Sequence, residues 1–307
     1  MTAWLVTGGA GFIGSHLCEA LLARGDAVRV LDDLSTGQRE NLPPAVELSE
    51  GDVADPAVVR DAMRGVAGCY HLAAIASVER GVSDRPGMRR TNLTGTITVF
   101  DAARAARTPI VYASSAAVYG DARDLPVTEE TEPRPLSAYG TDKLGCELHA
   151  RAATHEHGVP TVGLRFFNVY GPRQDPRSPD SGVISIFGER IRRGAPIDVF
   201  GDGAQTRDFV HVGDAVGALL AAMRLRPGGA PVFNVCSGHA TSVLGLAQLI
   251  GALTGVQPDV RHAPARAGEI RHSTGSPALA GRILGLPEPL RLRDGLFQVI
   301  GWLDASG

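Results

Sequence analysis

A glycine-rich turn between a buried strand and a helix constrains this chain more than any other feature. Ala3–Thr7 is a short apolar run that predicts a strand, and Ile13–Arg24 has the pattern of a helix. Between them lies Thr7-Gly8-Gly9-Ala10-Gly11-Phe12-Ile13-Gly14. Glycines let the turn close and let its backbone approach a ligand, while the helix start offers unpaired N–H groups and a positive dipole end. The turn therefore predicts a pyrophosphate-binding site.

An acidic pair at the end of the next strand extends this site. Ala27–Leu31 predicts the strand, and Asp32 and Asp33 follow it directly. At this position a carboxylate bonds the ribose hydroxyls of a bound dinucleotide. Two negative charges with no arginine directly behind them repel a 2′-phosphate, so we expect NAD rather than NADP.

Strands and helices alternate through the rest of the first half. The apolar runs and helical patterns that we assign are Val46–Ser49, Gly68–Leu72, Ile110–Ala113 and Thr161–Arg165 as strands, and Met88–Ala106 and Ala138–His157 as helices. Alternation of this kind predicts an α/β fold with a doubly wound parallel sheet covered on both faces.

The rhythm changes after Arg165. Gly171–Ser181 is rich in Pro, Arg, Asp and Ser and is typical of a long loop, whereas Val232–Val235 predicts one more strand of the main sheet. We expect a dinucleotide-binding domain at 1–165, with its sheet rejoined by about 201–240. A smaller mixed α/β substrate-binding cap would comprise 166–200 and 241–307, with helices at Gly182–Arg193 and Val243–Thr254; a further helix is expected at Gly213–Leu225.

Composition excludes several other classes. A net charge of −3 argues against a nucleic-acid binder, and the 307 residues suffice for a large buried core. The cysteines are far apart and form no CxxC pair, and the histidines form no metal-binding helix motif, so no disulfide framework or metal site is expected. No apolar run approaches the ~18 residues of a membrane span. We expect a cytoplasmic enzyme without membrane or nucleic-acid partners.

A tyrosine and a lysine form the candidate catalytic pair. Tyr139 and Lys143 are spaced i, i+4 in the helix Ala138–His157, so both side chains project from one face. An ammonium beside a phenol stabilises the tyrosinate by opposite charge, which makes a base able to take a proton from a sugar hydroxyl. Ser115, at the end of the Ile110–Ala113 strand, has a hydroxyl suited to bond the same substrate oxygen.

Other residues near the strand ends are candidates for the cofactor. Asp52 follows the third strand and either holds the adenine amino group or serves as a turn residue. Small residues in Leu72-Ala73-Ala74 leave room for a cofactor across the strand ends. Asn92 is a poor helix former within a helical pattern, and we expect it to reach inward.

Taken together, these motifs resemble the extended short-chain dehydrogenase/reductases of the NAD-dependent epimerase/dehydratase family over nearly the whole chain. The matching stretches are Thr7–Gly14, 32–37, 71–74, 92–96, Ser114–Gly120, Tyr139–Lys143, Arg165–Gly171, Arg207–Val212 and 266–269. The resemblance implies a Rossmann-type sheet, a homodimer, and Ser115, Tyr139 and Lys143 as the catalytic triad, with Lys143 also bonding the nicotinamide ribose. The NAD-binding residues that it implies are Gly8, Gly11, Phe12, Ile13, Gly14, Asp32, Asp33, Ser35, Thr36, Gly37, Asp52, Val53, Leu72, Ala73, Ala74, Asn92, Tyr139, Lys143 and Phe166.

The residues after Ser115 indicate which reaction to expect. Related dehydratases carry an Asp-Glu pair there and related decarboxylases a Glu, whereas this chain has Ala116 and Ala117. Methyl groups cannot transfer protons, so epimerisation at C4 through a transient 4-keto sugar is favoured. The open alternatives are a nucleotide-sugar reductase or dehydratase, and a non-catalytic NAD sensor, which would lack Tyr139 or Lys143.

Segments in the second half resemble bacterial UDP-N-acetylglucosamine and UDP-glucose 4-epimerases. Arg207 and Arg266 match family arginines that bind the substrate pyrophosphate; without that match, a surface ion pair would be the favoured interpretation of either residue. Ser273 aligns with a gate beside the sugar C2 substituent, where a tyrosine blocks an N-acetyl group; the alternative is an ordinary loop hydroxyl. The substrate residues implied for this UDP-sugar are Ser77, Val78, Ser115, Ala116, Tyr139, Asn168, Val183, Arg207, Arg266, Glu269 and Ser273.

Overall fold

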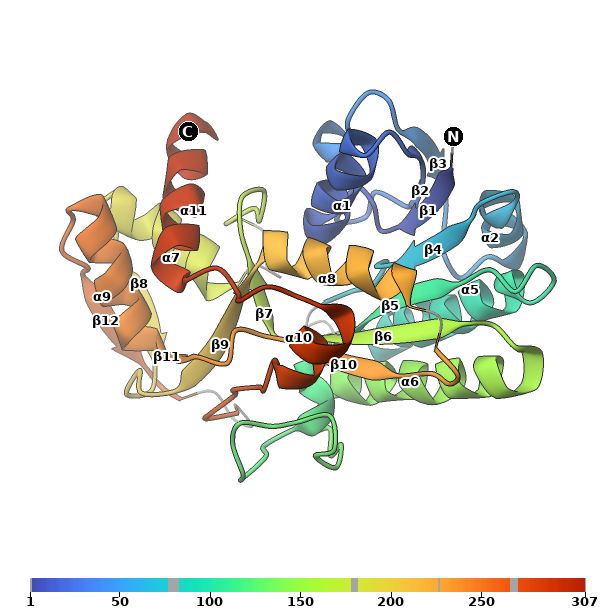
Figure 1. The fold of residues 1–307 in the computed structure, drawn as a ribbon. Helices are drawn as coiled ribbons and strands as arrows, with labels where there is room; N and C mark the ends of the chain where they lie inside the picture. Colours follow the sequence, from blue (N-terminus) through green and yellow to red (C-terminus); the bar gives the residue numbers. More distant parts are fainter. Residues whose placement is uncertain (1, 77–82, 178–181, 226, 266–269, 307) are drawn as a thin grey trace.

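The computed structural model describes residues 2–76, 83–177, 182–225, 227–265 and 270–306. Among these residues, seven parallel strands form a central sheet in the order β10-β6-β5-β4-β1-β2-β3 (Figure 1). The strands are β1 (Ala3–Thr7), β2 (Ala27–Asp32), β3 (Glu47–Glu50), β4 (Gly68–His71), β5 (Ile110–Ser115), β6 (Thr161–Phe166) and β10 (Val232–Val235). The strand order reverses between β1 and β4, and doubly wound sheets bind their ligands at the carboxyl ends of the strands at such a point.

Helices cover both faces of this sheet. Alternate residues of each strand point to opposite faces, so Val6 and Val30 pack with α1 and α8, whereas Leu5 and Leu31 pack with the other layer. The first layer is α1 (Phe12–Ala23), α8 (Val212–Arg224) and α10 (Ala278–Leu284), and the second is α2 (Pro56–Met63), α5 (Gly95–Ala103) and α6 (Ala138–His157). The predicted doubly wound α/β architecture is confirmed.

A second group of elements forms its own core beside the sheet (Figure 1). It contains two small sheets, one of β7 (Asn168–Tyr170), β9 (Thr206–His211) and β11 (Ala240–Ser242), the other of β8 (Ile197–Phe200) and β12 (Val260–Ala263). Helices α7 (Val183–Arg192), α9 (Val243–Thr254) and α11 (Leu292–Ser306) pack with them. Two elements depart from the expected division of the chain, since β9 pairs in the small sheet and α10 packs on the main sheet.

The helix expected over Met88–Ala106 is divided into three pieces. These are α4 (Arg85–Arg89), a π-helical turn η2 (Arg90–Thr94) and α5. The wider turn carries Asn92, which is buried and whose amide bonds both the N–H and the C=O of Ile75, at 2.8 and 3.0 Å. The inward orientation predicted for Asn92 is confirmed, and the π-turn explains it because it displaces this residue from the regular helix surface.

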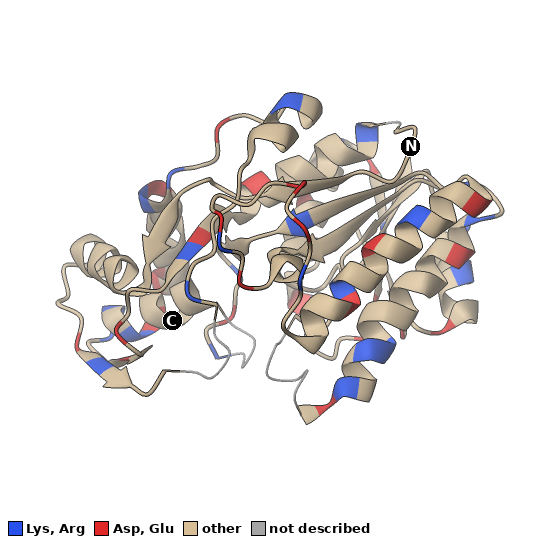
Figure 2. Ribbon diagram, turned by 90° about the horizontal axis from the view of Figure 1, so that it is seen from below, with Lys and Arg blue, Asp and Glu red and all other residues tan. Residues whose placement is uncertain are grey.

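Charged residues lie mainly on the helices and loops around the sheet, while the strands carry few of them (Figure 2). Within the described ranges, no helix has the length and hydropathy needed to cross a bilayer. The same ranges contain no group of three His, Cys, Asp or Glu residues arranged to hold a metal ion. Cys18, Cys69, Cys146 and Cys236 are all buried and unpaired, as expected for cysteines that act as small apolar residues.

Candidate active site

The glycine turn between β1 and α1 forms a cradle that side chains would fill. Gly8 has φ +72°, and a Cβ atom there would lie 2.6 Å from the backbone nitrogen of Ala73 after β4. A Cβ on Gly14 would lie 2.2 Å from the Gly8 carbonyl oxygen. Gly11 is the N-cap residue of α1, so no side chain caps the start of the helix. The first N–H groups of α1 therefore face an open turn, which suits the pyrophosphate of a dinucleotide.

Asp32 lies beside this turn at the end of β2. Its Oδ2 accepts the N–H of Ala10 and its Oδ1 accepts the N–H of Leu34, both at 2.9 Å. Burial raises the pKa of Asp32, although these two bonds favour the carboxylate. Because each oxygen retains a second lone pair, the carboxylate can also accept from ribose hydroxyls.

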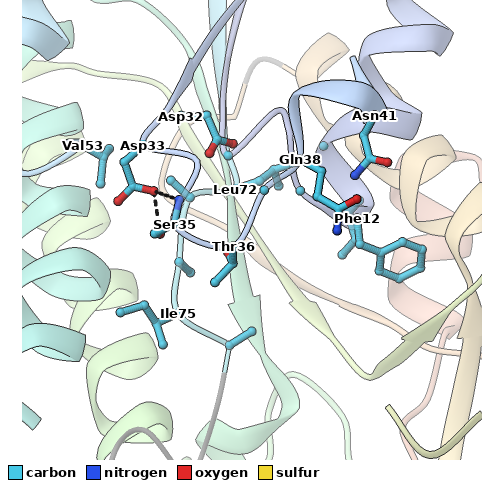
Figure 3. A pocket seen from close by; sticks show the side chains of 18 of the residues that line it. Phe12, Asp32, Asp33, Ser35, Thr36, Gln38, Asn41, Val53, Leu72 and Ile75 are labelled. Carbon is cyan, nitrogen blue, oxygen red and sulfur yellow. Dashed lines mark hydrogen bonds between the residues drawn. The ribbon is translucent and has the colours of Figure 1, made fainter. Parts of the chain in front are cut away.

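Asp33 adds a second carboxylate, which accepts the N–H and the hydroxyl of Ser35 at 3.0 and 2.6 Å. These two acids face a cavity of about 290 Å³ at the carboxyl ends of the strands (Figure 3). Predicted cofactor residues make up most of its wall: Gly8, Gly11, Phe12, Ile13, Gly14, Asp32, Asp33, Ser35, Thr36, Gly37, Val53, Leu72, Ala73 and Ala74. The residues present therefore fit a bound NAD at this cavity.

Sequence reasoning missed several wall residues. Gln38 and Asn41 continue the loop after Asp32, so their position in the chain was a usable signal. Arg173, Gln174 and Asp175 carry no such signal, because they reach the cavity from the segment after β7. The remaining unpredicted wall residues are Leu31, Gly51, Ile75, Ala76, Thr91 and Ala113.

Five predicted cofactor residues lie outside this wall. Asp52 accepts the N–H of Ala54 and pairs with Arg90 at 2.5 Å, which matches its alternative reading as a turn residue. Phe166 ends β6 inside the core on the α8 face. Asn92 supports the wall indirectly, since it holds the backbone of Ile75. The other two are Tyr139 and Lys143.

Tyr139 and Lys143 share one face of α6, with the lysine Nζ 5.8 Å from the centroid of the tyrosine ring. Lys143 is only 3% exposed, and its Nζ donates to the carbonyl oxygen of Ala113 at 2.9 Å. Ala113 is a wall residue of the cavity, so this bond brings the ammonium to the cavity edge. The pair has the geometry for a lysine-supported tyrosine base.

Ser115 is the half-buried last residue of β5. Its Oγ accepts the N–H of Ala117 at 3.1 Å and so caps the short turn η3 (Ala116–Tyr119). That bond uses a lone pair of the oxygen and leaves the hydroxyl hydrogen for another acceptor.

A buried network of polar side chains joins the elements that carry Ser115, Tyr139 and Lys143. The sequence analysis did not predict this network. Glu147, one turn beyond Lys143 on α6, accepts the Ser114 hydroxyl at 2.5 Å and pairs with Arg165 through both oxygens, at 2.8 and 2.7 Å. Arg165 donates to the Tyr119 hydroxyl at 2.8 Å, and that hydroxyl donates to Asn234 at 2.7 Å. The network thus joins β5, α6, β6, η3 and β10. The four-residue spacing of Tyr139, Lys143 and Glu147 was a usable signal.

Two predicted substrate residues, Arg207 and Ser273, bond the same carbonyl oxygen in the group of elements beside the central sheet. The Thr206 carbonyl oxygen accepts the N–H of Ser273 at 3.2 Å and the Arg207 guanidinium at 2.9 Å. Asn168 donates to the Asp208 carbonyl at 3.1 Å, and the Asp208 carboxylate accepts the N–H of Gly275 at 3.2 Å. Asp208 therefore ties β9 to the segment that holds Ser273.

The other predicted substrate residues lie apart from this contact or outside the described part of the chain. Val183 begins α7 and Ala116 begins η3, and both are half-buried. Ser77, Val78, Arg266 and Glu269 lie outside the described residues.

The fold and the cavity define a dinucleotide-dependent α/β enzyme, and comparison with known proteins gives its family. Residues 4–236 match the model of the NAD dependent epimerase/dehydratase family. The chain belongs to this family, and its cofactor is NAD.

Known relatives cover the whole chain. A UDP-glucose 4-epimerase of Mycolicibacterium smegmatis is 35% identical over 304 residues, which is 96% of each chain. The crystal structure of the Thermus thermophilus UDP-glucose 4-epimerase in complex with NAD superposes with a TM-score of 0.93 at 34% identity, over 100% of both chains. A UDP-N-acetylglucosamine 4-epimerase from Methanobrevibacter ruminantium, solved with UDP-N-acetylmuramic acid, has a TM-score of 0.94 at 30% identity, over 100% of this chain and 99% of that one.

Gly14→Ala should empty the cofactor site. The new Cβ would lie 2.2 Å from the Gly8 oxygen, so the turn must open, and we expect bound NAD to fall by ~10-fold or more, since overpacking costs about 1–3 kcal/mol. The measurement is the nucleotide released when purified protein is denatured. Gly217→Ala, on α8 with no atom within 4 Å of the new Cβ, is the control and should retain NAD. Release of NADP from the wild type would contradict the role given to Asp32 and Asp33.

Glu147→Gln should destabilise the fold, because it leaves the buried Arg165 guanidinium without its charge partner. Breaking such a pair costs about 3–5 kcal/mol. The urea unfolding midpoint measures this loss. Glu132→Gln removes an exposed partner of Arg134 and should change stability by no more than ~1 kcal/mol. Similar midpoints for the two variants would show that the buried pair contributes little.

Proposed function

We propose that this protein inverts C4 of a UDP-linked hexose, preferring UDP-N-acetylglucosamine and UDP-N-acetylgalactosamine and also accepting UDP-glucose and UDP-galactose. The observation that carries the proposal is the Tyr139–Lys143 pair on α6, joined to the cavity edge by the bond from Lys143 to Ala113. The relatives named as UDP-sugar 4-epimerases support the same reaction.

We also infer that the protein forms a homodimer through α5 and α6, and light scattering of the purified protein would check its mass in solution.

The side chains divide the proton chemistry between them. When bound, NAD supplies the transient oxidation and re-reduction of the sugar carbon. The Tyr139 phenolate oxygen takes the proton of the 4-hydroxyl and later returns it. Lys143 stabilises the phenolate by opposite charge, and it is held in place by Ala113. The Ser115 hydroxyl donates a hydrogen bond to the substrate oxygen, while one lone pair of its Oγ accepts the Ala117 N–H.

The residues after Ser115 argue against the alternative reactions of the family. Ala116 and Ala117 stand at the start of η3 and bring no group that can move a proton to or from a carbon beyond C4. A dehydratase needs such groups. A net reductase would consume NADH at each turnover, whereas the proposed epimerase regenerates its cofactor.

Ser273 supports the choice of an N-acetylated substrate. It is half-buried and shares the Thr206 carbonyl with Arg207, a residue that we assign to the substrate pyrophosphate. A serine occupies far less volume than the tyrosine expected at this position in an enzyme that excludes N-acetyl groups. We assign Arg266 and Glu269 to the same nucleotide end on the family resemblance.

Tyr139→Phe should lower turnover by ~100-fold or more, because the ring stays while the proton acceptor is lost. The assay incubates purified protein with UDP-sugars and no added nucleotide, and detects the C4 epimer. Tyr112→Phe is the matched control, since the Tyr112 hydroxyl is buried in the sheet with no partner among the described residues. Near-normal turnover by the Tyr139 variant would place the base elsewhere.

Ser273→Tyr should lower turnover of UDP-N-acetylglucosamine by ~10-fold or more, because the larger ring fills the space of the N-acetyl group. UDP-glucose turnover should survive, since a 2-hydroxyl needs less room. Both rates are measured on the same preparations of variant and wild type. Equal losses on both substrates would indicate general damage, and no loss on either would put residue 273 outside the pocket.

A further inference from the structure

One side of the NAD cavity is built by a segment that does not belong to the central sheet. The strap, defined here as residues 172–175, follows β7 and contributes Arg173, Gln174 and Asp175 to the cavity wall. Most of the remaining wall comes from the ends of β1, β2 and β4 and the loops after them. The cofactor cavity is therefore completed by a segment that forms no part of the central sheet.

Side chains of α1 hold the start of the strap. The Arg173 guanidinium pairs with Glu19 through two parallel contacts, Nη1 to Oε1 at 2.8 Å and Nη2 to Oε2 at 2.7 Å. Pairing of this two-pronged kind is stronger and more directional than a single contact between charges. Arg173 is 17% exposed and Glu19 is 52% exposed, so the pair is partly shielded from water.

His16 makes a second attachment between the same two segments. Its Nε2 lies 2.9 Å from the Pro172 carbonyl oxygen and 3.3 Å from Arg173 Nε. The carbonyl can only accept and is the nearer group, so Nε2 donates to it, and Nδ1 accepts from Arg173 Nη2 at 2.7 Å. That arrangement requires a neutral ring. Burial, with the Arg173 charge adding to it, lowers the pKa of His16 and so keeps the ring neutral.

The strap backbone adopts a conformation that its side-chain contacts must hold. Arg173 has φ +69°, in the left-handed region that residues with a Cβ rarely adopt. Strained positions of this kind persist where surrounding contacts over-determine them, and they cluster at ligand clamps. At the other end of the strap, Asp175 Oδ2 lies 3.5 Å from Nε2 of Gln38, a wall residue of the loop after β2.

We propose that the Arg173–Glu19 pair latches the strap to α1 and thereby sets the rate at which NAD leaves the cavity. The latch joins the strap to the helix whose N-terminus faces the pyrophosphate site. NAD or NADH must displace the strap to escape, which breaks the ion pair and the His16 contacts together. An enzyme that regenerates its cofactor at each turnover loses nothing by slow release. The inference deepens the family's use of NAD and does not depend on which sugar is the substrate.

Glu19→Gln tests the latch, because Glu19 lies outside the cavity wall and the substitution removes the carboxylate charge that pairs with Arg173 while it keeps the size of the side chain. Holoenzyme is loaded with NADH, chased with excess NAD, and followed by the loss of bound nicotinamide fluorescence. We expect release to accelerate by ~10-fold, which corresponds to about 1.4 kcal/mol. Glu47→Gln is the matched control, because Glu47 is an exposed residue of β3 that pairs with Arg29 of β2. Its NADH release rate should stay within about twofold of the wild-type rate.

Two further variants keep the test decisive. Arg173→Lys retains the positive charge but cannot make the two-pronged contact. Its release rate should lie between those of the wild type and Glu19→Gln. This variant also provides the test where Glu19→Gln folds poorly. The exchanged pair, Arg173→Glu with Glu19→Arg, should restore part of the slow release.

An unchanged release rate in both single variants would overturn the proposal. So would a loss of thermal stability in the NAD-free protein without faster release, because the pair would then only join two parts of the fold. The measurement contains no sugar, so a wrong substrate assignment leaves its result intact.

Discussion

The buried pair of Glu147 and Arg165 connects nearly every element that carries the candidate chemistry. It anchors α6, and with it Tyr139 and Lys143, to strand β6. Through Ser114 it also holds the end of β5, next to Ser115. Two charges taken out of water cost free energy unless both are well paired, so this interaction tolerates little displacement of either element. The spacing between the candidate tyrosine base and the Ser115 hydroxyl depends on that geometry.

The same polar network reaches the opposite side of the site. The side-chain oxygen of Asn234 on β10 accepts a hydrogen bond from the Tyr119 hydroxyl, and its amide nitrogen donates to the Val127 carbonyl at 3.2 Å. The Val127 N–H donates to the Thr274 carbonyl, and the Val127 carbonyl accepts the N–H of Ser276. Both partners lie within three residues of Ser273. These hydrogen bonds therefore link the candidate proton-transfer residues to the segment that carries the proposed specificity residue. The cofactor side is built differently, because the strap is attached by partly exposed side chains.

Local sequence signals were sufficient where a residue acts through its neighbours in the chain. The glycine turn, Asp32 and the Tyr139–Lys143 spacing each lie within a single strand, turn or helix. In the structure the glycines and Asp32 line the cavity, and Lys143 donates to the carbonyl oxygen of Ala113, a residue of the cavity wall. The strands β7, β8, β11 and β12 were not predicted, because each has only three or four residues and lies outside the strand–helix alternation that indicated the equally short β3 and β4. The π-turn at η2 was also invisible to periodicity, although the poor helix propensity of Asn92 pointed to its inward orientation.

The sequence by itself determined the α/β class, the binding of a dinucleotide and the identity of the candidate base. These follow from alternating apolar segments, from glycines that the turn requires, and from i, i+4 geometry. Only the tertiary structure decided that Asp52 pairs with Arg90, that Glu147 pairs with Arg165, and that Arg173 completes the cavity wall while paired with Glu19. The physical reason is that an ion pair between residues as far apart as Glu19 and Arg173 depends on how two lobes pack. No local pattern along the chain encodes that distance.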